Sequence, residues 1–158
     1  MTDDGTVAIR RARTADAAAV ASVHIPASRA AAMPYLPPQR RTHEQVADWV
    51  RKVHLQETLT WVAEYRGEVV GYASLAEGLL HHLYLRPDMR RRGIGTLLLD
   101  EARRHSPAGL SLHVFQQNTD ARAFYEHHGF TVARTGDGSG NMENLPDLTM
   151  RWEPGSAV

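Results

Sequence analysis

The sequence predicts a single α+β domain, residues 1–158, in which helices flank a central, mostly antiparallel mixed sheet. Short apolar segments typical of strands are separated by tight polar turns, and segments with helical spacing of apolar residues lie between them. The chain also has the length of one domain and carries no internal repeat or linker-like stretch.

The N-terminal part is predicted to form a strand and two helices. "TVAIRRA" begins with alternating apolar residues and predicts the first strand. Thr14 or Asp16 can cap a helix through "AAAVASVHI", and Pro26 should interrupt or kink that helix. After the proline-rich loop "MPYLPPQRR", the segment "THEQVADWVRKV" has helical spacing, and Thr42 with Gln45 fits a capping box.

The remaining elements alternate more regularly. "TLTWVAEY" and "EVVGYASL" are joined by "RG", which favours a hairpin, and the strand "LLHHLYL" follows the turn "AEG". A helix then begins near "GIGTLLLDEA", with Ile94, Leu97, Leu98 and Ala102 as its inner stripe. "GLSLHVF" is a strand, "NTDARAFYEHHG" a helix ending at Gly129, and "FTVARTG" and "DLTMRW" are the last strands.

The composition argues against several classes of function. Lys and Arg number 18, as do Asp and Glu, so the chain lacks the basic excess of nucleic-acid-binding proteins. The absence of cysteine excludes disulfides, a thiolate nucleophile and cysteine-based zinc sites, and we expect no metal. No apolar run is long enough to span a membrane, and "MTDDGTVAIRRAR" has no hydrophobic signal core. We therefore expect a cytoplasmic protein with no nucleic-acid or membrane partner.

The segment "RPDMRRRGIG", from Arg86 to Gly95, concentrates positive charge on a glycine-containing turn that leads into a helix. Free amide groups at a helix N-terminus attract anions, and glycine lets a phosphate approach the backbone. Neighbouring arginines add charge-assisted hydrogen bonds. Neither "GxxxxGK[ST]" nor the three-glycine dinucleotide fingerprint is present. The segment thus predicts another kind of phosphate site, with a solvated basic turn as the alternative.

The spacing Arg-x-x-Gly-x-Gly is met by Arg90, Gly93 and Gly95. Here the sequence resembles the GNAT superfamily of acyl-CoA-dependent N-acyltransferases. "HLYLRPDMRRRGIGTLLLDEA" is similar to the pyrophosphate motif of that family, and "NTDARAFYEHHGF" to its second motif. The resemblance covers nearly the whole chain. It implies a GNAT-like domain splayed at the cofactor strand, acetyl-CoA as co-substrate, and a small-molecule or peptide amine as acceptor. A homodimer is compatible with it.

The resemblance also implies roles for single residues. The backbone of Leu83 and Leu85 would pair with the pantetheine arm, Asn118 would steady that arm, and Tyr125 would act as general acid at the sulfur. The whole cofactor-binding set that it implies is Leu83, Tyr84, Leu85, Arg90, Arg91, Arg92, Gly93, Ile94, Gly95, Thr96 and Asn118. Direct transfer needs a proton acceptor and a proton donor but no covalent intermediate, which suits a chain without cysteine.

The general base is less directly indicated. Many members of the family carry a glutamate where this sequence has Leu79. Period-two alternation would place Glu77 and His81 on one strand face and His82 on the other, as a packed or surface residue. An unperturbed histidine titrates near neutral pH, so His81 is the favoured base. Glu77 is the second candidate unless it belongs to the turn "AEG", and a water relay to a carboxylate is the third.

The acceptor amine is expected to contact the first helices, "MPYLPP" and "DGSGNMENLPD". In the second loop Asn141 and Glu143 are the predicted substrate-binding residues, beside Asp137 and Asp147, with a solvated loop as the alternative. A non-catalytic acyl-CoA sensor on the same fold is the competing function. A nucleic-acid-binding module that uses the arginine cluster is disfavoured by the zero net charge.

Overall fold

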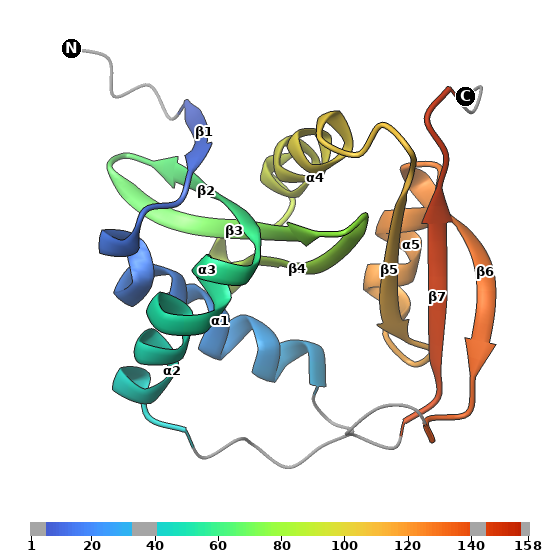
Figure 1. Ribbon diagram of the computed structural model, residues 1–158, viewed down its shortest axis with the longest axis horizontal. Coiled ribbons are helices and arrows are strands. Elements are labelled where there is room, and N and C mark those ends of the chain that lie inside the picture. The colour runs from blue at the N-terminus through green and yellow to red at the C-terminus, as the bar shows by residue number, and fades with distance from the viewer. Residues whose placement is uncertain (1–5, 33–40, 140–144, 156–158) are drawn as a thin grey trace.

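The computed structural model describes residues 6–32, 41–139 and 145–155. One sheet of seven strands runs through the molecule in the order β1-β2-β3-β4-β5-β7-β6 (Figure 1). Its strands are β1 (Val7–Arg11), β2 (Leu59–Tyr65), β3 (Glu68–Ala76), β4 (Leu79–Leu85), β5 (Leu110–Phe115), β6 (Thr131–Gly136) and β7 (Asp147–Trp152). Only β4 and β5 pair in parallel among these strands, so the prediction of a mostly antiparallel mixed sheet is confirmed.

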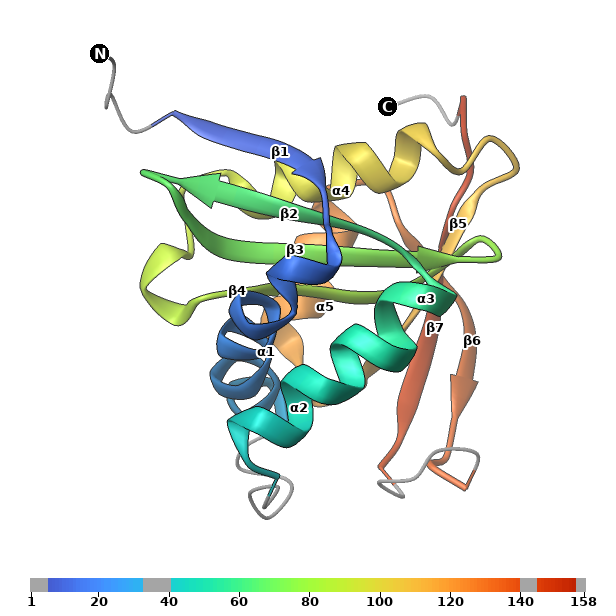
Figure 2. The same ribbon diagram turned by 60° about the vertical axis from the view of Figure 1, so that its left-hand side comes forward.

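Helices cover both faces of the sheet (Figure 2). They are α1 (Ala17–Ala32), α2 (His43–Trp49), α3 (Leu55–Glu57), α4 (Ile94–Arg104) and α5 (Thr119–His127), and a π-helical turn, Val50–His54, joins α2 to α3. Residues of α1 and α2 pack on one face, around Val62 and Tyr72. α4 and α5 pack on the other face. The two faces therefore have separate cores.

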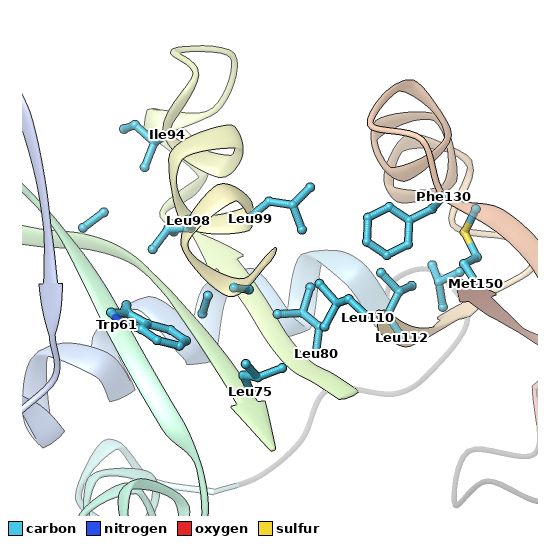
Figure 3. Close-up of a cluster of buried hydrophobic side chains, with 14 of the residues drawn as sticks. Trp61, Leu75, Leu80, Ile94, Leu98, Leu99, Leu110, Leu112, Phe130 and Met150 are labelled. Carbon is cyan, nitrogen blue, oxygen red and sulfur yellow. The ribbon is translucent and has the colours of Figure 1, made fainter. Parts of the chain in front are cut away.

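The larger core lies between the sheet and α4 (Figure 3). Leu98 and Leu99 of α4 are fully buried there, close to Leu80, Leu110 and other core residues of β4 and β5. The predicted inner stripe of this helix is wrong at one position, because Leu97 is 41% exposed and Leu99 takes its place. A helix packed against a twisted sheet buries a broad stripe, and the spacing alone does not fix its edge.

Two tight turns set the register of the central strands. Arg66 and Gly67 both have positive φ, as do Glu77 and Gly78, so each pair forms the two-residue hairpin turn that matches the twist of the flanking strands. The predicted "RG" hairpin is confirmed. Glu77 is exposed and lies in the second turn, not in a strand.

The N-terminal segment, from the turn before α1 to α2, differs from expectation in two details. Asp16 is no N-cap: it ends a short 3-10 turn and its carboxylate accepts from the backbone of Arg13 at 2.6 Å. α1 is not interrupted at Pro26, the first of the two expected effects of this proline, and Ala27 beside it is buried. Burial of this helix against the sheet offsets the missing backbone hydrogen bond. The capping box of Thr42 and Gln45 is confirmed.

A partly buried ion pair links β1 to the turn that precedes α1. Arg10 donates to both carboxylate oxygens of Asp16, at 2.8 and 2.9 Å. These hydrogen bonds hold the pKa of Asp16 below its usual value. A lowered pKa means that the stabilisation is present above the ordinary pKa and is lost as pH falls through the folded-state pKa.

We expect Asp16→Asn to lower the free energy of unfolding at pH 7 by about 1–3 kcal/mol, the usual worth of a buried hydrogen bond to a charged group. The difference from wild type should narrow below pH 3.8, the ordinary pKa of the carboxyl. Urea unfolding at pH 7 and at pH 3 measures both. Asp88→Asn, at an exposed ion pair with Arg86, is the control and should matter far less. Equal effects of the two substitutions would contradict this account.

Candidate active site at the divided sheet

The sheet divides between β4 and β5. Their ladder consists of Leu79 with Ser111 and Leu80 with Leu112, while β4 continues to Leu85 beside β3. The N–H of Arg86 donates to Val70 of β3 at 2.8 Å, so by alternation the backbone of Leu83 and of Leu85 points away from β3. These two residues therefore present hydrogen-bonding groups at the division, where the resemblance implied a pantetheine arm. Tyr84 pairs with Tyr72 of β3 and contributes its side chain instead.

A bulge in β4 changes which side chains share a face. His82 pairs with Ser74, but Leu80 pairs with Leu75, so His81 is the inserted residue. The expectation that Glu77 and His81 share a strand face is therefore wrong. His81 is exposed at the bulge. His82 is partly buried on the α1 face of the sheet, which agrees with its expected packed position.

The arginine-rich turn leads into the N-terminus of α4. Gly93 is the N-cap, with φ of 80°, and a side chain is strained at this φ. Arg92 lies over the ring of Tyr65, 5.9 Å from its centroid. Within the described residues, Arg90 and Arg91 are exposed and make no ion pair. Two guanidinium groups thus stand beside the positive end of the helix, an arrangement suited to a phosphate.

Gly95 serves the packing of two helices as well as the turn. A Cβ at this position would lie 3.3 Å from the ring of Phe124 on α5. The next residue, Thr96, is linked to α5 through His128. His128 donates from Nδ1 to the carbonyl of Phe124 at 2.7 Å, and its Nε2 forms a hydrogen bond with the Thr96 hydroxyl at 3.0 Å. Ile94, at the start of α4, is buried and belongs to the core.

α5 brings the predicted acid toward the division. Asn118 caps this helix, because its side-chain oxygen accepts from Ala121 at 3.2 Å, which leaves the amide nitrogen as its other polar group. The ring of Tyr125 packs edge-on against Phe124 and Phe130. Burial, and then the neighbouring phenol of Tyr84, raise the pKa of Tyr125 well above its ordinary value. Tyr125 is therefore a protonated donor near neutral pH.

Sequence reasoning missed a hydrogen-bonded chain under α1. The Tyr72 hydroxyl bridges Nδ1 of His24, at 2.7 Å, and Nδ1 of His82, at 2.9 Å. His54 stacks on His82, with ring centroids 4.7 Å apart, and its Nε2 is 2.6 Å from the hydroxyl of Ser74. The available signal was that polar side chains occupy inward positions of β3 and β4. Their partners are distant in sequence and could not be identified from it.

Other expectations fall outside what the structure describes. Asn141, Glu143 and the "MPYLPP" loop lie outside the described residues. The carboxylate of Asp137 accepts a hydrogen bond from the backbone N–H of Ser139 at 2.9 Å, so this side chain has a local structural role in the loop. No group of three histidine or acidic side chains suited to a metal ion occurs among the described residues. No helix in the described segments has the length and apolar character to cross a membrane.

We expect Gly95→Val to destabilise the fold by about 1–3 kcal/mol, because the added side chain meets Phe124 and moves α5. Gly93→Val meets no atom within 4 Å, but its φ of 80° remains unfavourable. Both should weaken binding of the pyrophosphate group that the resemblance implies at this turn, as in coenzyme A, more than Arg91→Ala does, since neighbouring arginines partly replace one lost charge. Urea unfolding and calorimetry measure the two effects. Equal losses of affinity in all three variants would mean that the glycines only form the turn.

Comparison with known proteins identifies the family. Residues 56–132 match the acetyltransferase (GNAT) domain. The peptidyl-lysine N-acetyltransferase YiaC of Escherichia coli is 36% identical over 105 residues, which cover 65% of this chain and 69% of that protein. Alignments with two YjaB proteins, also described as peptidyl-lysine N-acetyltransferases, cover 54% and 59% of their lengths.

Solved structures share the fold over nearly the whole chain. The solution structure of apo YjaB from Escherichia coli is 26% identical, covers 93% of this chain and 97% of that one, and has a TM-score of 0.73. The acetyltransferase YncA from Salmonella typhimurium, solved with acetyl-CoA, is 22% identical, with 97% and 96% covered and a TM-score of 0.71. Sequence match and shared fold agree: the chain belongs to the GNAT family of acetyltransferases and has the fold of an acetyl-CoA-dependent acyltransferase.

Proposed function

We propose that the protein is an N-acetyltransferase that moves the acetyl group of acetyl-CoA directly to a primary amine. The division of the sheet beside the N-terminus of α4 carries this proposal. Ligands of open sheets bind beyond the carboxyl ends of parallel strands where the connections diverge, and β4 and β5 are the parallel pair here. The anion-binding turn follows β4, and the residue proposed as the acid follows β5.

Acetyl-CoA fits the groups found at this place. The outward backbone of Leu83 and Leu85 would pair with the amides of the pantetheine arm, and the amide nitrogen of Asn118 would reach the same arm. The turn from Arg90 to Thr96 would hold the pyrophosphate through its amides and exposed guanidinium groups. Gly95 leaves α4 and α5 close together, which keeps the turn and Tyr125 in one site.

Tyr125 is proposed as the general acid that meets the departing thiolate. Its pKa is raised by burial, so the hydroxyl keeps its proton until a strong acceptor is next to it. A thiolate in water is a weaker base than a tyrosinate. A coenzyme A thiol bound in the same buried place would also have a raised pKa, so the difference between the pKa values of the thiol and of Tyr125 would be smaller than in water. The hydroxyl of Tyr125 can then donate a hydrogen bond to the sulfur as negative charge develops there.

The acceptor is proposed to be the side-chain amine of a lysine in a peptide. Three of the relatives are described as peptidyl-lysine N-acetyltransferases, and this is the support for the choice over a small amine. An acetyl-CoA-dependent thiol-release assay with a lysine peptide, a polyamine, an aminoglycoside and a free amino acid tests it. Turnover with one class of amine supports an enzyme. Tight binding of acetyl-CoA without release of thiol from any of them would favour the sensor instead.

Acetyl-CoA and coenzyme A should stabilise the fold, while ATP and NAD should do so far less. Nucleotides can reach the pyrophosphate turn but lack the arm that pairs with β4. At 100 times its dissociation constant a ligand adds about 2.7 kcal/mol to the free energy of unfolding. Thermal unfolding with each ligand measures this. An unchanged melting temperature at millimolar acetyl-CoA would overturn the proposed function.

Tyr125→Phe should keep the affinity for acetyl-CoA and lower kcat by roughly 10²–10⁴-fold, the usual worth of a positioned acid. The ring and its contacts with Phe124 and Phe130 remain, so the loss isolates the hydroxyl. Because the pKa of Tyr125 lies above the ordinary 10.0, the wild-type rate should not fall between pH 7 and 9 through loss of this proton. Steady-state kinetics and calorimetry decide, and a variant at full rate would leave Tyr125 without this role.

A further inference from the structure

The chain His24–Tyr72–His82 has a fixed proton count. A phenol has one proton to donate, and here it lies between two imidazole nitrogens. In the neutral chain the hydroxyl therefore donates to one Nδ1 and accepts from the Nδ1–H of the other ring. The second ring nitrogen of each histidine, Nε2, is left for a different partner. Such a chain can take up a proton at one end and release one at the other.

We propose that His82 is the general base of this enzyme and that Tyr72 and His24 carry the proton away from it. This inference rests on the proposed acetyl transfer. In the resting arrangement His82 donates from Nδ1 to Tyr72, Tyr72 donates to Nδ1 of His24, and Nε2 of His82 has a free electron pair.

The proton transfer balances in three linked moves. Nε2 of His82 takes a proton from the acceptor ammonium, which leaves the amine lone pair to attack the thioester carbonyl. The Nδ1 proton of His82 passes to the Tyr72 oxygen, and the hydroxyl proton of Tyr72 passes to Nδ1 of His24. His24 then holds the added charge until the acetyl group has moved. As the C–N bond forms and the C–S bond breaks, Tyr125 gives its proton to the thiolate, and the second proton of the attacking nitrogen replaces it. His24 loses its Nε2 proton to water after this step, and the reverse shift of protons along the chain restores the resting arrangement before the next turnover. No oxidant, reductant or further reactant is required.

The position of His82 suits this role better than that of His81. His82 precedes Leu83, whose backbone faces the division of the sheet. Its ring contacts Tyr84, with centroids 5.3 Å apart, and the phenol of Tyr84 is close enough to Tyr125 to affect its pKa. Tyr84 is thus a common neighbour of the proposed base and the proposed acid. His81 stands exposed at the bulge, outside this chain.

The surroundings keep all three imidazoles neutral near pH 7. Burial lowers the pKa of His82 below the ordinary 6.5, and His54, His24 and His81 add to the effect. Burial also lowers the pKa of His24, with help from Arg41 ahead of α2, and that of His54, to about 4. Tyr72 on β3 and Tyr84 on β4 face the same rings. The structure shows no carboxylate within hydrogen-bonding distance of His82 among the described residues.

The test uses the pH dependence of kcat/KM with a lysine peptide. In wild type a base removes the proton from the bound ammonium, so the profile should be flat from pH 7 to 9. Without the base, only amine that is already neutral reacts. The rate should then rise about tenfold per pH unit toward the lysine pKa of about 10.4. A packing defect would instead lower the rate by one factor at every pH.

His82→Phe keeps a ring against His54 and should lower kcat/KM at pH 7 by about 10²–10⁴-fold, with the rising profile and unchanged acetyl-CoA affinity. Tyr72→Phe removes one oxygen and should give the same profile with a smaller loss. Ser74→Ala is the matched control: it removes another buried hydroxyl of β3, the one bound to His54, and should keep the flat profile.

A flat pH profile of kcat/KM in His82→Phe would overturn the inference. It would also be overturned if His81→Ala gave the rising profile while His82→Phe kept the wild-type kcat/KM. Equal, pH-independent losses in Tyr72→Phe and Ser74→Ala would reduce the chain to a packing role and also overturn it. If Tyr72→Phe does not fold, His24→Phe interrupts the other end and should show the same rise. A wild-type protein that binds no acetyl-CoA would overturn the proposed function first.

Discussion

The early end of the ladder between β4 and β5 is the constraint on which the rest of the structure depends. Beyond Leu80 and Leu112 the two strands separate, so on that side the backbone of β4 has hydrogen-bonding groups that no strand of the described residues satisfies. Helices that follow the two strands, α4 and α5, meet where Gly95 faces the ring of Phe124. That contact leaves no room for a side chain between the two helices. A bulkier residue there would change the width of the division and the place of Tyr125 together.

Two environments of opposite kind meet at this division. The arginine turn is exposed and charged, as a site for the phosphates of a soluble ligand requires. Tyr125 and His82 are partly buried, and burial moves their pKa values in opposite directions, so both side chains are neutral near pH 7. A protonated phenol and an unprotonated imidazole are the states that the proposed acid and the proposed base need at the start of a turnover.

Much of the fold could be predicted because its signals are local. The hairpin at Arg66 and Gly67 and the capping box at Thr42 follow from residues adjacent in sequence. The errors arise where packing decides. Continuity of α1 through Pro26 depends on burial against the sheet, and the exposure of Leu97 depends on how α4 lies on it.

The candidate site could be predicted where a motif encodes backbone geometry and not where side chains from distant segments meet. A glycine turn before a helix was expected at Gly93, and this residue is the N-cap of α4. That Gly95 also makes room for Phe124 requires knowledge of the position of α5. The bridge from Tyr72 to His24 and His82 joins three elements, and no spacing in the sequence reports it.

The bulge at His81 shows how one inserted residue decides the chemistry of the strand. With strict alternation Leu80 would face α1 together with His82, and His81 would face α4 with Leu83. The extra residue shifts the phase, so Leu80 joins Leu83 in the larger core while His82 keeps the α1 face. The bulge at His81 thus allows both the burial of Leu80 and the contact of His82 with Tyr72. The strand places a leucine in its core and a histidine in its polar chain, and a regular strand could not do both.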